Sequence, residues 1–145
     1  MGRRMTNAQA SLMGFVILVA ALIGIGTAYY DGVPLAMWPA IITVAFALVA
    51  HAGINVLNDY YDELNGTDRI NSERIYPYTG GSRFIQNGVL TLRETAVFGV
   101  LLVLAVVVAG LWLAAISGSG VLTIGALGMF IGWAYSAPPL RLNSR

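Results

Sequence analysis

Three long stretches of this sequence contain no charged residue: residues 5–30, 32–58 and 95–140. A helix needs about 20 apolar residues to cross a bilayer. The first two stretches can each hold one such helix. The third can hold two, because the Ser117-Gly118-Ser119-Gly120 segment favours a turn. The sequence therefore predicts an all-α, polytopic transmembrane bundle of about four spans, at residues 11–30, 35–57, 95–116 and 121–135.

The composition supports a membrane protein of one domain, residues 1–145. Hydrophobic residues make up 57% of the chain and charged residues 10%, whereas soluble domains carry about 25% charged residues. A net charge of +1 argues against nucleic-acid binding. The absence of cysteine excludes disulfides, thiolate metal sites and a cysteine nucleophile.

The arginines predict the orientation in the membrane. They occur before the first span, between the second and third, and after the fourth; they are Arg3, Arg4, Arg69, Arg74, Arg83, Arg93, Arg141 and Arg145. Basic residues concentrate on the cytoplasmic side of membrane proteins. We therefore expect a multi-pass protein of the cell inner membrane, with both termini and the loop of residues 58–94 in the cytoplasm.

A polar cluster follows the second apolar stretch directly. Residues 58–68 read N-D-Y-Y-D-E-L-N-G-T-D and contain Asn58, Asp59, Asp62 and Asp68. Charged groups beside hydrocarbon are costly and usually functional. If the second span stays helical to its end, helical spacing places these residues on one stripe: His51, Asn55, Asn58 or Asp59, and Asp62.

The charge of this cluster suggests a cation. Carboxylates near a helix C-terminus repel the helix dipole and one another, and a divalent cation would remove that conflict. Mg²⁺ takes one or two carboxylates and leaves positions for phosphate oxygens, so a diphosphate is a natural ligand. Arg69, Arg74 and Arg83 could neutralise its remaining charge.

Several alternatives stay open at this point. The cluster could be a plain polar loop with surface ion pairs, Arg83 could anchor the loop through an ion pair, and His51 could be hydrogen-bonded packing. Small residues four apart, such as Gly128 and Gly132, suggest close helix packing, with chance as the alternative. An EF-hand and a P-loop are excluded by their missing ligand patterns.

Three segments together resemble the UbiA-type membrane prenyltransferases. Residues 58–68 resemble their first aspartate-rich motif, N-D-x-x-D-x-x-x-D, with the third aspartate displaced to Asp68. That spacing, and the G-G-S-R-F-I-Q-N-G-V-L-T segment at 80–91, are most similar to the branch that prenylates 1,4-dihydroxy-2-naphthoate in menaquinone synthesis. The Y-S-A-P-P-L-R-L segment at 135–142 is similar to the family's Y-S-x-P-P-x-R-L signature.

The resemblance implies roles for individual residues. It implies Mg²⁺ as cofactor, with Asn58, Asp59, Asp62 and Asp68 as metal ligands. It implies diphosphate contacts from Asn58, Asp68, Arg69 and Arg83, and catalytic roles for Asp59, Asp62 and Arg83.

The resemblance also implies a reaction. A polyprenyl diphosphate would alkylate an aromatic acceptor, which is 1,4-dihydroxy-2-naphthoate in the most similar branch. Alternatives are another acceptor of the 4-hydroxybenzoate, haem or chlorophyll type, or a non-enzymatic four-helix membrane subunit. Members of the family usually have about nine spans and a second aspartate-rich motif. We therefore expect this chain to correspond to the N-terminal half, with little activity alone and a C-terminal half as a candidate partner.

Overall fold

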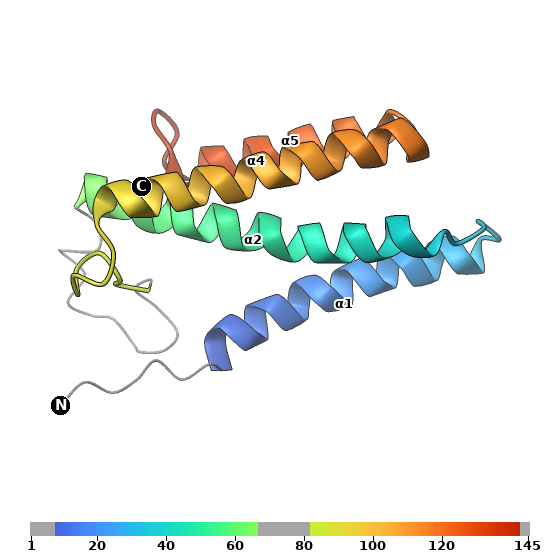
Figure 1. The fold of residues 1–145 in the computed structure, drawn as a ribbon, viewed down its shortest axis with the longest axis horizontal. Helices are drawn as coiled ribbons and strands as arrows, with labels where there is room; N and C mark the ends of the chain where they lie inside the picture. The colour runs from blue at the N-terminus through green and yellow to red at the C-terminus, as the bar shows by residue number, and fades with distance from the viewer. Residues whose placement is uncertain (1–7, 67–81, 143–145) are drawn as a thin grey trace.

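Helices are the only regular secondary structure in the main elements of the described part of the chain. The structure is a computed structural model that describes residues 8–66 and 82–142, and side chains from residue 14 onward. Within those ranges it contains α1 (Ala8–Tyr30), α2 (Met37–Asn65), α4 (Leu92–Ser117) and α5 (Gly120–Ser136), and no strand (Figure 1). The prediction of an all-α bundle is confirmed.

Local sequence explains where these helices begin and end. Pro39 lies in the first turn of α2, where proline is tolerated. The same helix ends at Gly66, whose φ of 75° suits a left-handed cap. A capping box opens α4, since Thr91 and Glu94 each accept a hydrogen bond from the other's backbone N–H. The predicted break between the last two helices is present at Gly118, with φ 102°.

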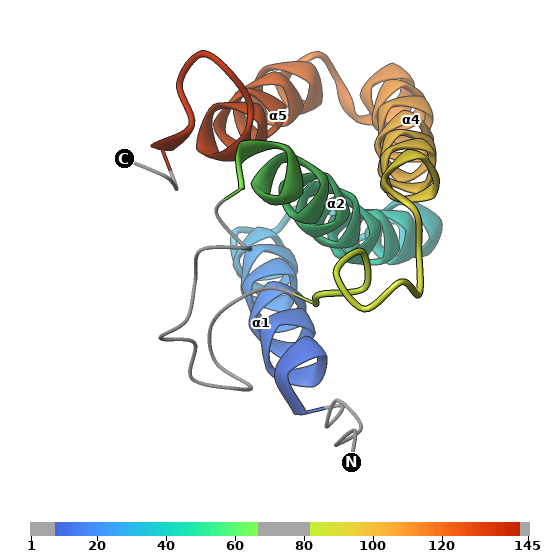
Figure 2. The same cartoon turned by 90° about the vertical axis from the view of Figure 1, so that its left-hand side faces the viewer.

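Helix α2 is the central element of the bundle. It packs against α1, α4 and α5, and the end-on view places α1 on one side of it and the α4–α5 hairpin on the other (Figure 2). Glycines allow close approach on the hairpin side. A Cβ on Gly99 of α4 would lie 2.7 Å from Leu57 Cδ2, and one on Gly132 of α5 would lie 2.6 Å from Ile54 Cδ1. Gly128, the other member of the G-x-x-x-G pair, has nothing within 4 Å.

The surface of the bundle is apolar, as expected of helices that face lipid. Large hydrophobic side chains such as Ile124 and Phe130 are 74% and 56% exposed. In the described part, α2 and α4 are long and apolar enough to cross a membrane, while residues 14–30 of α1 and the whole of α5 form shorter apolar helices.

Helix α2 also continues beyond residue 57, the predicted end of its span, to Asn65. The polar cluster therefore begins on a helix and not in a loop.

Candidate functional site

The acidic cluster occupies the last turns of α2. Asn58, Asp59 and Asp62 all lie within this helix, so the condition for a common polar stripe is met. Asp62 is 9% exposed, which is unusual for a carboxylate, and Asp59 is half-buried. The two carboxylates are close enough to repel each other electrostatically. Buried carboxylates of like charge need compensating partners.

Asn58 links Asp62 to a distant helix. Its side-chain Nδ2 donates to Asp62 Oδ2 at 2.8 Å, across one turn of α2. Its Oδ1 accepts a hydrogen bond from Ser136 Oγ at 2.5 Å, which comes from the last residue of α5. Sequence reasoning had not selected Ser136 as a site residue. The only signal for it was its place in the Y-S-A-P-P-L-R-L segment.

Asp59 is joined to the loop that follows the undescribed segment. The Ser82 hydroxyl donates to Asp59 Oδ2 in a short hydrogen bond, 23 residues away in sequence. Beside this pair lies a cavity of about 80 Å³. It is lined by side chains of α2, the loop and α4: Val56, Asp59, Ser82, Phe84, Ile85, Leu90, Thr95 and Phe98. The carboxylate of Asp59 thus faces a small, mostly apolar hollow.

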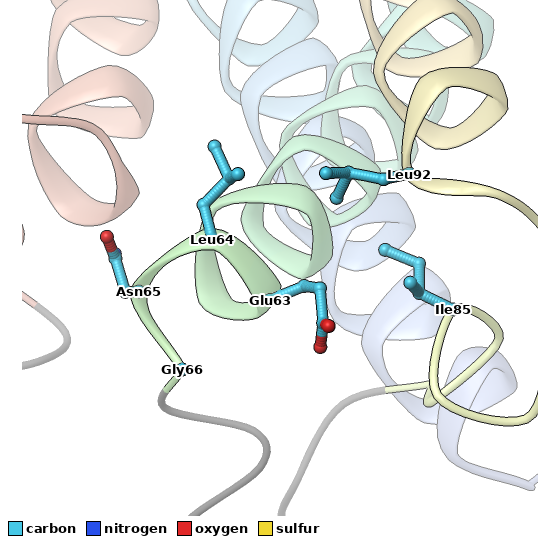
Figure 3. Close-up of a pocket in the computed structure, with 6 residues that line it drawn as sticks. All are labelled: Glu63, Leu64, Asn65, Gly66, Ile85 and Leu92. Carbon is cyan, nitrogen blue, oxygen red and sulfur yellow. The ribbon is translucent and has the colours of Figure 1, made fainter.

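A second hydrogen bond attaches the same loop to Glu63, a third carboxylate near the end of α2. Gln86 Nε2 donates to Glu63 Oε2 at 2.9 Å. Another pocket, about 540 Å³, opens beside this contact and is shown in Figure 3. Its described lining is Glu63, Leu64, Asn65, Gly66, Ile85 and Leu92. Those described lining residues include none of the predicted ligands, so we place the candidate site at the carboxylates and not in this pocket.

The predicted basic residues are only partly covered by the structure. Arg83 follows Ser82 directly and adopts a left-handed backbone with φ 55°. Among the described residues it makes no ion pair. Asp68, Arg69 and Arg74 lie outside the described residues.

The polar stripe also contains an internal pair. Asn55 Nδ2 donates to the backbone oxygen of His51 at 2.9 Å and lies 3.0 Å from its ring Nε2. Both residues are thus engaged within one turn of α2. This contact agrees with the interpretation of His51 as hydrogen-bonded packing.

The donor set of this cluster fits a Mg²⁺ site that is shared with a phosphate ligand. Within residues 8–66 and 82–142 no group of three or more acidic or histidine side chains converges on a point. Mg²⁺ does not require one, since it commonly uses one or two carboxylates and takes its other ligands from water and phosphate. Asp59 and Asp62 supply that number of carboxylates from adjoining turns of one helix.

The Ser82 contact leads to a prediction about the loop. We expect Ser82→Ala to raise the rate of tryptic cleavage after Arg83 by about tenfold, because a hydrogen bond to a charged group contributes about 1.5–3 kcal/mol and cleavage follows the opened population. Mass spectrometry of timed digests in detergent measures this. The control is Ser119→Ala, since the Ser119 side chain makes no capping hydrogen bond. Equal cleavage rates in both variants would mean that Ser82 does not hold the loop.

The model of the UbiA prenyltransferase family matches residues 3–145. Neither the curated proteins nor the solved structures gave a match. The match therefore includes all the described residues of the candidate site, from Asn58 to Ser136.

Proposed function

This chain belongs to the UbiA prenyltransferase family, and on that premise we propose that it binds a polyprenyl diphosphate and transfers the prenyl group to an aromatic acceptor. The family membership suggests prenyl transfer within a membrane. The proposal adds that the acceptor is 1,4-dihydroxy-2-naphthoate, that Mg²⁺ is required, and that residues 58–94 face the cytoplasm of a multi-pass inner-membrane domain.

One observation supports the proposed site above the others. Asp62 is buried at the polar end of an apolar helix and is held by Asn58 at 2.8 Å. Burying a carboxylate in that position costs stability. A plain polar surface would have no need for this burial, whereas a ligand site would. Its place beside Asp59 is consistent with a site for a cation and a diphosphate.

The proposed roles follow from the side-chain chemistry. Asp59 and Asp62 are the groups that would hold Mg²⁺, with Asn58 and Asp68 as further candidate ligands. Mg²⁺, when bound, supplies positive charge that stabilises the departing diphosphate. Arg83 lies next to the Asp59 partner Ser82, and its guanidinium suits paired hydrogen bonds to phosphate oxygens; Arg69 is proposed for the same task.

The proposed reaction is an alkylation of an electron-rich ring. The allylic C–O bond breaks and the diphosphate leaves with the electron pair. The ring carbon that carries the carboxylate forms the new C–C bond in 1,4-dihydroxy-2-naphthoate, and the C–CO₂ bond then breaks, so that its electron pair restores the aromatic ring and CO₂ leaves. The protein must keep water from the allylic cation. The apolar cavity wall beside Asp59, which includes Phe84 and Phe98, is suited to that task.

The direct test is ligand binding, followed by turnover. The purified chain in detergent should bind a non-hydrolysable polyprenyl thiodiphosphate with Mg²⁺ and much more weakly with EDTA, as measured by isothermal titration calorimetry. Binding is measured first because this sequence contains one aspartate-rich motif, which could bind the diphosphate even where turnover is low. Turnover is then assayed with 1,4-dihydroxy-2-naphthoate and with 4-hydroxybenzoate. Binding that is absent, or equal with and without Mg²⁺, would refute the proposed function.

A further inference from the structure

The hydroxyl of Ser136 forms a different kind of hydrogen bond from three threonine hydroxyls in the described helices. Within a helix, serine and threonine hydroxyls usually bond to the carbonyl four residues earlier. Thr27, Thr43 and Thr95 do so, at 2.9, 2.8 and 3.0 Å. Ser136 instead donates across the bundle to Asn58 Oδ1 at 2.5 Å, 78 residues away in the sequence. It is 2% exposed, so this bond is formed out of contact with water.

The two hydrogen bonds that link Ser136, Asn58 and Asp62 have only one possible order of donors and acceptors. An ionised carboxylate accepts hydrogen bonds and cannot donate them. The Asn58 amide must therefore present its NH₂ group to Asp62, as it does at 2.8 Å, and its oxygen to Ser136. Rotating the amide by half a turn would put Asn58 Oδ1 against Asp62 Oδ2, and two acceptors would then face each other. Ser136 therefore stabilises the one amide orientation that donates to Asp62, and linked hydrogen bonds of this kind strengthen one another.

The packing of α5 on α2 brings Ser136 to this position. One turn earlier, Gly132 lies against Ile54 so closely that a Cβ would be 2.6 Å from Ile54 Cδ1. Two nearby residues in the sequence, Ala134 and Ala137, are also buried, at 4% and 1% exposed. The end of α5 is thus fixed against the end of α2, and Ser136 has little freedom to turn away.

From these contacts we infer that Ser136 is a positioning residue: through Asn58 it sets the direction of the Asp62 carboxylate toward a Mg²⁺–diphosphate ligand. The inference rests on the proposed function of Asp62. Ser136 itself touches neither metal nor substrate in this scheme. Its contribution is to fix a ligand's hydrogen-bond partner, and losses of such partners typically reduce metal affinity about 10–100-fold.

The main test compares Mg²⁺ titrations of thiodiphosphate binding. Ser136→Ala should raise the Mg²⁺ concentration at half-saturation about 10–100-fold. Ser119→Ala, at the opposite end of α5, is the matched control and should leave it unchanged. In an Asn58→Ala background, Ser136→Ala should cause no further loss, because residues that act through one network are not additive.

A second measurement begins with the unaltered chain, so its first result does not depend on whether a variant folds. In ¹⁵N-asparagine-labelled chain, NMR should show the Asn58 side-chain NH₂ group slow to exchange with water, and Ser136→Ala should shift its resonances while Ser119→Ala does not. Rapid exchange of that group in the unaltered chain would overturn the inference.

The remaining outcomes separate the inference from the proposed function. If the unaltered chain binds with Mg²⁺ and Ser136→Ala binds equally well, the role of Ser136 is refuted and the proposed function stands. If Ser136→Ala weakens binding equally in the Asn58→Ala background and in the unaltered chain, Ser136 does not act through Asn58 and that part of the inference is refuted. If the unaltered chain does not bind at all, the proposed function fails, and the role of Ser136 fails with it.

Discussion

The Asp62→Asn variant should lose Mg²⁺-dependent binding of a polyprenyl diphosphate, by more than about 100-fold, together with any turnover. The change removes one negative charge and keeps the shape of the side chain. Asn58 can still donate its hydrogen bond, because the new amide also presents an oxygen. Interactions with a metal ion are worth several kcal/mol, and each 1.4 kcal/mol is a factor of about ten in affinity. Calorimetric titration with the thiodiphosphate measures the effect.

The neighbouring carboxylate provides the control for this experiment. Glu63→Gln also removes one negative charge from the last turn of α2, but Glu63 is directed at Gln86 and the larger pocket. We expect its binding to stay within about threefold of the unaltered chain, as for most substitutions outside such a site. Equal losses in both variants would show that total charge matters and not the position of Asp62. An unchanged Asp62→Asn variant would remove Asp62 from the site.

Local spacing was enough to predict the part of the site that lies on one helix. Asn58 and Asp62 are four residues apart, and side chains at that spacing share a face of any α-helix. Their 2.8 Å hydrogen bond therefore needs no knowledge of the rest of the fold. The extent of α2 was less accessible. The sequence predicts a span that ends at residue 57, with a helical continuation only as a condition, whereas the backbone stays helical until Gly66 adopts a left-handed cap.

The contacts between helices could not be predicted from spacing. The bond from Ser136 to Asn58 depends on how α5 crosses α2, and that crossing depends on the fit of Gly132 against Ile54. A G-x-x-x-G pattern indicates that some helix approaches closely but not which one, nor which of its glycines is in contact. The attachment of Ser82 to Asp59 is similar, since it depends on where the loop returns to the helix end.

The close approach of α4 to α2 gives the second prediction with a large effect. A Cβ on Gly99 would lie 2.7 Å from Cδ2 and 2.8 Å from Cγ of Leu57, and 3.2 Å from Cγ1 of Val56. Gly99→Leu must therefore push the two helices apart or displace Leu57. Overpacking of this kind typically costs about 1–3 kcal/mol, and we expect a loss at the upper end, measured by thermal unfolding in detergent.

Gly110→Leu is the matched control, because Gly110 lies on the same helix with nothing within 4 Å of its Cβ position. Leucine favours a helix over glycine by about 1 kcal/mol or less, so this variant should be as stable as the unaltered chain or more so.

Gly99→Leu should also weaken Mg²⁺-dependent ligand binding. Leu57 directly precedes Asn58, and Thr95 and Phe98 of α4 line the cavity beside Asp59. If both variants unfold at the same temperature, the close approach of Gly99 to Leu57 does not limit how α4 packs on α2.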